Sequence, residues 1–339
     1  MIKLTTLDAG HGVWAIGYWI LRPLGLILII FAAATPVSLA RSGERASVQA
    51  DRRVAITIDD LPYVGGPNDV EAAARVTTKI VAALAAQRAP AVAFVTSSRV
   101  LVRDQVDERM DLLRRWRDAG LELANHGHSH LSFQTTPPRR YRDDAVQGDL
   151  IPRLLLEEVG REPRYYRHPF NHTGPSREEK RAFETFMAKR GYRIAPFTVE
   201  HGDYLFNALY VAARAEGDSV RMGRIGDVYL AQLDTAFAFA EELSRETFGR
   251  EIAQVLLIHA NDINADHLSE MLPRLSRRGY RFVSLQEALV DPAYATPDEY
   301  VGPTGISWLH RWRVALGLPE RWREEPDPPA WILEAYRNR

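Results

Sequence analysis

Short apolar runs alternate with longer amphipathic stretches from about residue 53 to residue 290. The apolar runs predict buried strands at 54–58, 91–95, 121–124, 165–167, 255–258 and 280–283. The stretches with apolar residues three and four apart predict helices at about 69–88, 105–119, 143–159, 176–190, 206–248 and 266–278. Repeated strand–helix units imply an α/β fold with a parallel sheet, either open or closed into a barrel.

Residues at the ends of these stretches support the helix assignments. Ser176 followed by Glu179 is a capping box that starts a helix. Gly120, Gly191 and Gly279 stand just after the last apolar position of three helices, where a left-handed residue commonly ends a helix.

The same pattern divides the chain into four parts. Residues 1–40 read as a signal peptide or an N-terminal membrane anchor, 41–52 as a polar linker and 53–290 as the barrel. Residues 291–339 form an extension rich in Trp, Pro and Arg, which we expect to pack its indoles on the outside of the barrel. The alternative for this extension is a sugar-stacking patch or a membrane-surface contact.

Composition excludes several classes of protein. Of 339 residues, 46% are hydrophobic and 26% charged, which is typical of a globular protein. The net charge of −1, from 43 basic and 44 acidic residues, gives no basic stripe of the kind that nucleic-acid-binding proteins carry. Because the sequence contains no Cys, it has neither a disulfide framework nor a thiolate nucleophile nor a Cys-based zinc site.

The N-terminus carries an apolar core flanked by export signals. Residues 23–40 read PLGLILIIFAAATPVSLA, with Ser38 and Ala40 at the small positions that a signal peptidase reads and Arg22 as the positive flank. Alternatively, residues 14–34 span the bilayer uncleaved. Both readings predict a periplasmic or extracellular catalytic part, which contacts a membrane only if the segment is uncleaved.

Polar residues with catalytic chemistry stand at the carboxyl ends of several predicted strands. In parallel α/β folds these ends meet at one rim, where ligands and catalytic groups collect. Residues far apart in sequence are therefore expected to converge there: Asp59 and Asp60, His126 and His130, Arg167, and His259.

The Asp and His pairs together suggest a metal site. Two adjacent carboxylates on an extended chain point opposite ways, so one is free to bind a metal while the other faces substrate. His126 and His130, four residues apart, would lie on one face of a helical turn, with His128 pointing elsewhere. With Asp60 they make a ligand set that suits Zn²⁺ and leaves a position open for water. The alternative is a polar loop in which the histidines only form hydrogen bonds with backbone groups and bind no metal.

Arg167 and His259 are the two remaining candidates. A guanidinium after a strand can hold the carboxylate of Asp59 ionised and oriented, or form a salt bridge on the barrel rim. His259 follows four apolar residues and is therefore expected to be partly buried. A lone buried histidine more often has a structural role. Beside a predicted metal site at the rim of the barrel, a catalytic role becomes the better expectation.

Taken together, these residues resemble the polysaccharide deacetylase family, the NodB-homology domain of carbohydrate esterase family 4, over residues 54–289. The four motifs that carry the resemblance occur in the family's order: Thr57-Ile58-Asp59-Asp60, Asn125-His126 through His130, Arg167-His168-Pro169-Phe170 and Leu256-Leu257-Ile258-His259. Two positions depart from the family pattern. Gly127 replaces the usual Ser or Thr, and Glu200 through Tyr204 is a weakened form of an Asp-x-x-Asp-Trp motif.

The resemblance implies a distorted (β/α)₇ barrel with Zn²⁺ or another divalent ion held by Asp60, His126 and His130. It implies that Asp59 takes the proton of an activated water and that protonated His259 donates a proton to the departing amine.

Three further residues have implied roles. The resemblance implies that Arg167 orients Asp59. It also implies that Asp203 pairs with His259 and raises the pKa of His259. It implies that the backbone N–H of Phe170 stabilises the oxyanion and that Tyr204 contacts the substrate.

The implied activity is hydrolysis of N-acetyl groups on an amino-sugar polymer or oligosaccharide, with an N-acetylated glycan as the partner. One alternative keeps the catalyst and changes the substrate to a small non-sugar amide or a lipid-linked sugar. The other is a non-catalytic carbohydrate-binding envelope protein, against which both Asp59 and His259 argue.

The N-terminal signal generates the first testable prediction. We expect cleavage after Ala40 and a soluble mature protein outside the cytoplasm, because the apolar core is short and ends in Ser-Leu-Ala. N-terminal sequencing of the exported protein checks this. Recovery of a chain that still carries residues 24–34 from the membrane fraction would instead establish the anchor.

Overall fold

The computed structural model describes residues 51–65 and 69–339. The predicted signal peptide or anchor at 1–40 and nearly all of the linker at 41–52 lie outside the described residues. Within the described part of the chain, no helix combines the length and apolar character that a membrane crossing requires.

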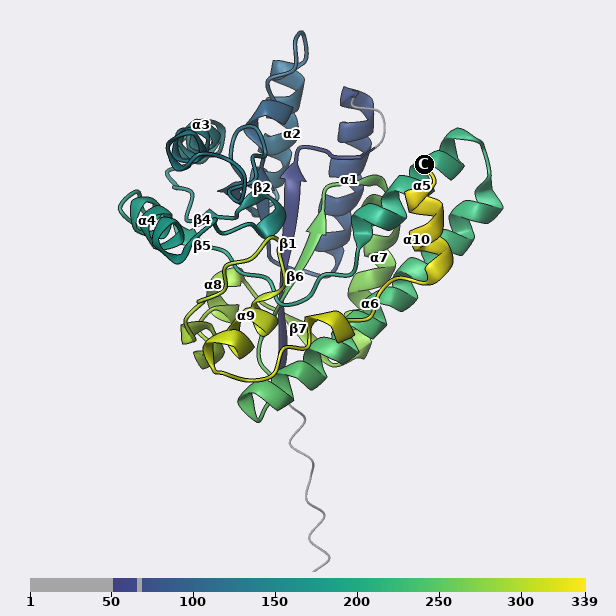
Figure 1. Ribbon diagram of the computed structural model, residues 1–339. Coiled ribbons are helices and arrows are strands. Elements are labelled where there is room, and N and C mark those ends of the chain that lie inside the picture. Colours follow the sequence, from purple (N-terminus) through teal and green to yellow (C-terminus); the bar gives the residue numbers. More distant parts are fainter. Residues whose placement is uncertain (1–50, 66–68) are drawn as a thin grey trace, which may run out of the picture. The chain divides into compact units, whose positions relative to one another are not determined.

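A parallel sheet of seven strands forms the centre of the described chain (Figure 1). Its hydrogen-bonded order is β5-β4-β3-β2-β1-β6, and β7 pairs with the first residues of β1. The strands are β1 (Arg52–Leu61), β2 (Ala91–Val95), β3 (Glu122–Asn125), β4 (Tyr165–Tyr166), β5 (Arg193–Ile194), β6 (Gln254–His259) and β7 (Tyr280–Phe282).

The sheet curls round so that its two edges meet. After β5 the chain runs on to Val199, which pairs in parallel with Leu256 of β6. Leu257 N–H donates to the carbonyl of Val199 at 2.9 Å, and Thr198 N–H donates to that of Val255 at 2.9 Å. Because β6 also pairs with β1, this contact links the ends of the sheet and confirms the distorted (β/α)₇ barrel.

Helices connect the strands and pack around the sheet (Figure 1). The helices of the barrel are α1 (Val70–Ala86), α2 (Val106–Asp118), α3 (Pro138–Glu157), α4 (Arg177–Ala188), α5 (Asp203–Ala215), α6 (Ser219–Phe248), α7 (Asp262–Arg277) and α8 (Leu285–Ala288). The capping box forms as predicted, since the Ser176 hydroxyl accepts from Glu179 N–H.

Several elements differ from the sequence-based prediction. The helical stretch at 206–248 is two helices, α5 and α6, and α3 begins at Pro138, five residues earlier than predicted. Strand β1 does not end before Asp59 but continues through both aspartates to Leu61. Strand β5 was not predicted, because two residues are too few to show a hydrophobic pattern. Helix α7 begins one turn earlier than expected, since the side chain of Asn261 accepts from Asn264 N–H and caps it.

The core lies between the sheet and the surrounding helices. Strands β1 and β6 are buried almost throughout and carry near-continuous apolar runs, as expected of strands covered on both faces. Inside the barrel the side chain of Arg167 is fully buried, with its guanidinium 4.5 Å from the ring of Phe94 on β2. A charged group thus fills space that apolar side chains usually occupy.

The C-terminal segment 291–339 contains helices α9 (Trp308–Ala315) and α10 (Ala330–Arg337). Trp308 N–H donates to the carbonyl of Phe197 at 2.9 Å, and Trp308 and Trp312 are buried. Trp322 and Trp331 are only partly buried. Helix α10, yellow in Figure 1, packs against α5.

A tight helix–loop contact generates a prediction about stability. A Cβ atom on Gly148 of α3 would lie 2.4 Å from the backbone carbon of Gly127 and 2.6 Å from Asn125 Oδ1. Although Ala favours helices, Gly148→Ala should lower the free energy of unfolding by about 1–3 kcal/mol, because it overpacks this contact.

Gly223→Ala is the matched control. Gly223 is an exposed glycine of α6 whose added Cβ would meet nothing within 4 Å. This substitution should raise the free energy of unfolding by about 0.5–1 kcal/mol. Urea unfolding of both variants decides the point, and equal stabilisation by the two would contradict the contact.

Candidate active site

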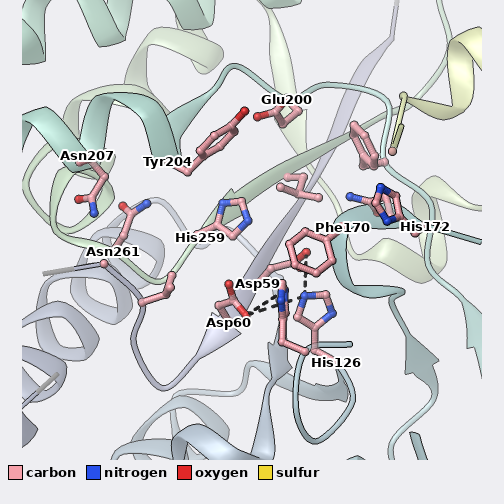
Figure 2. Close-up of a pocket in the computed structure, with 18 of the residues that line it drawn as sticks. Asp59, Asp60, His126, Phe170, His172, Glu200, Tyr204, Asn207, His259 and Asn261 are labelled. Atoms are coloured by element: carbon pink, nitrogen blue, oxygen red, sulfur yellow. Dashed lines mark ion pairs between the residues drawn. The ribbon is translucent and has the colours of Figure 1, made fainter. Parts of the chain in front are cut away.

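The predicted site residues converge at the carboxyl ends of the strands. One cavity of about 840 Å³ is lined by Asp59, Asp60, His126, His130 and His259. They come from the end of β1, the loop after β3 and the end of β6. Figure 2 shows Asp59, Asp60, His126 and His259 gathered round the same part of the cavity.

The two aspartates do not point in opposite directions, and that part of the prediction is wrong. Asp60 has a φ of 67° and the pairing register with β2 shifts between Ile58 and Leu61, so the side-chain alternation of an extended strand breaks here. Asp59 Oδ2 lies 3.7 Å and Asp60 Oδ1 4.0 Å from Nε2 of the same imidazole, His126. Both carboxylates therefore reach one site.

The two histidines do not lie on a helical turn as predicted. Residues 126–130 form a loop in which Gly127 has a φ of 77° and His130 a φ of 54°. The Asp144 carboxylate closes the loop by accepting from the backbone N–H groups of His128 and Ser129. The loop nevertheless brings the two imidazoles together, with ring centroids 5.1 Å apart.

Asp60, His126 and His130 form a three-ligand cluster. One ligand atom from each lies within 4.8 Å of the other two, and His130 Nε2 is 3.5 Å from Asp60 Oδ1. His126 Nδ1 lies 2.9 Å from the carbonyl oxygen of Arg167. Since a carbonyl only accepts, Nδ1 carries the proton and leaves Nε2 with a free lone pair towards Asp60, as metal-binding histidines are usually held. This donor set fits a borderline divalent cation such as Zn²⁺.

Charge around the cluster favours an ionised ligand. Burial alone would raise the pKa of Asp60, but His130 and Arg99 outweigh it and hold that pKa well below its usual range. Arg99 Nε lies 3.5 Å from Asp60 Oδ1, and the Thr96 hydroxyl donates to the same oxygen at 3.0 Å. The neighbouring groups thus fix both the charge and the orientation of this carboxylate.

Arg167 holds the other aspartate, as one of the two sequence-based alternatives expected. Its Nη1 donates to Asp59 Oδ1 at 2.9 Å and to the Thr57 hydroxyl at 2.7 Å, while Nη2 donates to the carbonyl of Pro196 at 2.9 Å. Both side chains of the ion pair are buried, so they do not form a salt bridge on the rim. Asp59 therefore keeps Oδ2 directed at His126.

His259 forms the second paired group in the cavity. Its Nδ1 lies 2.7 Å from Asp203 Oδ1, and Asp203 also accepts from the backbone N–H of His259 and the side chain of Asn261. Burial would lower the pKa of His259, but the negative charge of Asp203 outweighs it and raises that pKa to about 10. His259 therefore carries a proton at neutral pH, with Nε2 free of the aspartate.

A turn at Phe170 and Asn171 forms one wall of the cavity. Both residues have left-handed φ angles, 57° and 53°, which cost non-glycine residues free energy. Phe170 is half exposed and its ring lies 4.4 Å from that of His130. The structure thus places the ring of Phe170 beside the cluster of Asp60, His126 and His130.

Arg311, which sequence reasoning did not single out, holds this turn from behind. Its guanidinium is fully buried and donates to the carbonyl of Asn171 at 2.7 Å and to that of Ile306 at 2.8 Å. It is balanced by Asp298 at 3.2 Å. No local motif marks Arg311, because its partners are up to 140 residues away.

The end of the cavity beyond His259 contains Glu200 and Tyr204, from the weakened Asp-x-x-Asp-Trp motif (Figure 2). Burial, followed by the nearby negative charges of Asp203 and Glu325, raises the pKa of Glu200 to about 7. Tyr204 is 51% exposed into the cavity. Residues of the C-terminal segment complete the lining, and sequence reasoning missed these: Pro303, Thr304, Gly305, Tyr336 and Arg339.

Comparison with known proteins finds a similarity over part of the chain. A family model described as polysaccharide deacetylase matches residues 46–182. No curated protein matches the sequence.

Several solved structures are similar to the chain. The CE4 family pseudoenzyme BA3943 from Bacillus anthracis is 16% identical over 75% of this chain and 68% of that one, with a TM-score of 0.49. The polysaccharide deacetylase Bc1974 from Bacillus cereus is 16% identical over 69% and 91%, with a TM-score of 0.48. The peptidoglycan deacetylase PdaC from Bacillus subtilis is 18% identical over 70% and 91%, with a TM-score of 0.44.

The family model begins before β1 and ends within α4, so it includes the first three motifs and the metal-binding cluster. The fourth motif lies beyond the match, but β6 brings His259 into the same cavity. The chain is thus similar to polysaccharide deacetylases over residues 46–182, the part that the family model matches.

Proposed function

We propose that this protein is an exported, metal-dependent deacetylase that hydrolyses N-acetyl groups on an amino-sugar polymer or oligosaccharide. The observation that carries the proposal is the content of one cavity. A carboxylate–imidazole cluster suited to a divalent cation lies beside two oriented pairs, Asp59 with Arg167 and His259 with Asp203. The similarity of residues 46–182 to polysaccharide deacetylases suggests the substrate class, and the sequence of residues 23–40 supports export.

The cation would be held by Asp60, His126 and His130. When bound, it would lower the pKa of a water molecule and polarise the amide carbonyl. Hydrogen bonds hold these ligands in place, since the Thr96 hydroxyl donates to Asp60 and the Arg167 carbonyl accepts from Nδ1 of His126.

Asp59 is the general base in this proposal. One of its oxygens is occupied by Arg167, and the hydroxyl of Thr57 accepts from the same guanidinium, so Oδ2 alone faces the cluster. An ionised carboxylate held this way can accept a proton from the attacking water without rotating. Arg167 acts through Asp59 and is a positioning residue.

His259 is the general acid. An amide nitrogen leaves poorly unless it is protonated, and His259 carries a proton at neutral pH because of Asp203. In this proposal the backbone N–H of Phe170 stabilises the negative oxygen that develops on the carbonyl. Arg311 keeps that turn in place by its bond to the carbonyl of Asn171.

The His259–Asp203 pair predicts a specific pH dependence of stability. The pKa of His259 rises from 6.5 to about 10, so its contribution is complete below pH 6.5 and is lost as the pH rises towards 10. Burial opposes ionisation of Asp203, but His259 lowers its pKa from 3.8 to about 2, so that contribution is lost as the pH falls towards 2.

Asp203→Asn should therefore destabilise the protein most between these two ranges. We expect the difference in free energy of unfolding from the wild type to be largest near about pH 5 and smaller near about pH 9. Urea unfolding at the two pH values measures it. A difference that grows with pH would show that the imidazolium–carboxylate pair is not the stabilising form.

The separate roles of the two neighbouring aspartates provide the test of the proposed function. The metal-loaded wild type should release acetate from an N-acetylated glycan, lose this activity on chelation and regain it with added metal. Asp59→Asn should keep the metal but lower kcat by about 10²–10⁴-fold, because an amide cannot accept the proton. Asp60→Asn should weaken metal binding, and excess zinc should restore part of its activity.

Metal content by elemental analysis, measured beside acetate release, separates these outcomes, with His126→Ala as a metal-free reference. Loss of metal in Asp59→Asn together with retention in Asp60→Asn would exchange the two roles. A metal-loaded wild type that releases no acetate from any N-acetylated glycan would overturn the proposed function.

A further inference from the structure

The loop that joins His126 to His130 needs support from outside itself. Residues 127–130 belong to neither a helix nor a strand, so no regular ladder of hydrogen bonds fixes them. Gly127 and His130 both have left-handed φ angles, 77° and 54°. A non-glycine residue keeps such an angle only where its surroundings over-determine it. The groups that hold this loop therefore decide where the imidazole of His130 lies.

Asp144 of α3 uses both of its carboxylate oxygens on this loop. Its Oδ2 accepts from the backbone N–H of His128 at 2.9 Å, and its Oδ1 accepts from that of Ser129 at 3.0 Å. Asp144 is only 6% exposed, so water competes little for these charge-assisted bonds. Because the two N–H groups belong to consecutive residues midway between the histidines, one carboxylate fixes the path of the chain from His126 to His130.

The loop and α3 approach each other closely at two glycines. A Cβ atom on Gly127 would lie 2.8 Å from Asp144 Oδ2, and one on Gly148, a turn further along α3, would lie 2.4 Å from the backbone carbon of Gly127. The side chain of Asn125 also links the two elements. Its Oδ1 accepts from Gly127 N–H at 2.8 Å, and its amide group donates to the carbonyl of Ala145 at 2.8 Å. These contacts give the loop one position relative to α3.

The two histidines depend on this support to different degrees. His126 has an anchor of its own, since its Nδ1 donates to the carbonyl of Arg167 at 2.9 Å. Among the described residues, the imidazole of His130 has no backbone partner of this kind. Its Nε2 lies 3.5 Å from Asp60 Oδ1, and its ring packs against those of His126 and Phe170. The position of His130 is therefore set mainly by the loop that Asp144 holds.

We propose that Asp144 is a positioning residue for the metal site, which sets the affinity for a divalent cation through the loop without being a ligand. A ligand that is already in place loses less conformational freedom when the cation binds, so it binds more tightly. Asp144 belongs to none of the motifs that carry the family resemblance. The inference rests on the metal-binding part of the proposed function, and not on the reaction or the substrate.

The zinc affinity of Asp144→Asn tests this role. The amide has nearly the shape of the carboxylate but only one acceptor oxygen, so one of the two loop N–H groups faces an NH₂ group. We expect the Kd for Zn²⁺ to rise by about 10–100-fold, the range found for groups that orient metal ligands. Competition between the metal-free protein and a chromophoric zinc chelator measures this Kd without any turnover.

Asp291→Asn is the matched control. Asp291 is 3% exposed and likewise accepts from two backbone N–H groups, those of Ala253 and Ala293, each at 3.0 Å. Ala253 directly precedes β6, so this site lies at the other end of that strand from His259. The control should lower the free energy of unfolding but leave the zinc Kd within about twofold of the wild type.

Two results from this pair would overturn the proposal. One is a folded Asp144→Asn that binds zinc as tightly as the wild type. The other is an equal loss of affinity in Asp144→Asn and Asp291→Asn, because metal binding would then follow overall stability and not the loop.

Gly127→Ala acts on the same contact without replacing Asp144, and it decides the question if Asp144→Asn does not fold. Its added Cβ would meet Asp144 Oδ2 at 2.8 Å and push the carboxylate away from the loop. Gly120→Ala is its control, since Gly120 has a similar φ of 83° but its Cβ would meet nothing within 4 Å. The zinc Kd should rise by about tenfold or more in Gly127→Ala only. Equal Kd values in Gly127→Ala and the wild type would contradict the proposal.

Acetate release separates this inference from the proposed reaction. If the wild type binds zinc but hydrolyses no N-acetylated glycan, and Asp144→Asn binds zinc more weakly, the reaction fails and the positioning role stands. If the wild type binds zinc and releases acetate while Asp144→Asn keeps the wild-type Kd, the reaction stands and the positioning role fails. A wild type that binds no divalent cation would overturn both.

Discussion

The buried ion pair between Arg167 and Asp59 is the interaction on which both the barrel and its site depend. The guanidinium lies inside the barrel and bonds to β1 through Thr57 and Asp59 and to the chain after β5 through Pro196. Burial of a charge is costly, and removing one partner of such a pair typically costs about 3–5 kcal/mol because the other is left uncompensated. The same guanidinium thus ties β1 to the chain after β5 and orients Asp59, the proposed base, beside the cluster of Asp60, His126 and His130.

Irregular backbone, and not regular secondary structure, brings the remaining groups together. Asp60, His130 and Phe170 all have left-handed φ angles, each of which costs a non-glycine residue on the order of 1–3 kcal/mol. In regular conformations Asp60 would point away from Asp59, and residues 126–130 would continue as a strand or turn into a helix. The surrounding hydrogen bonds, such as those from the loop to Asp144, make the irregular conformations the stable ones.

This distinction explains how far the sequence alone could lead. The apolar runs predicted β2 at its observed bounds and β6 to within a residue at each end, because strands buried on both faces have a strong pattern. The motifs named the residues that converge, since parallel strands place their carboxyl ends at one rim. The opposed aspartates and the helical turn of the histidines were wrong, because both arguments assumed regular geometry. Arg311 and Tyr336 belong to no motif, and only the folded chain shows that they reach the site.

The C-terminal segment therefore belongs to the architecture of the site, beyond its packing on the barrel. Arg311 reaches from α9 to the Asn171 carbonyl, and its guanidinium lies 3.9 Å from the ring of Trp308. The backbone N–H of Trp308 in turn donates to the carbonyl of Phe197, a residue that lines the cavity. Gly305 approaches the Phe170 carbonyl so closely that an added Cβ would lie 1.9 Å from it. A strained turn stays in place only if its surroundings allow no alternative, and this segment supplies that constraint from outside the barrel. A fold of β–α units provides the reacting groups, and a segment that follows those units provides the rigidity of the wall facing them.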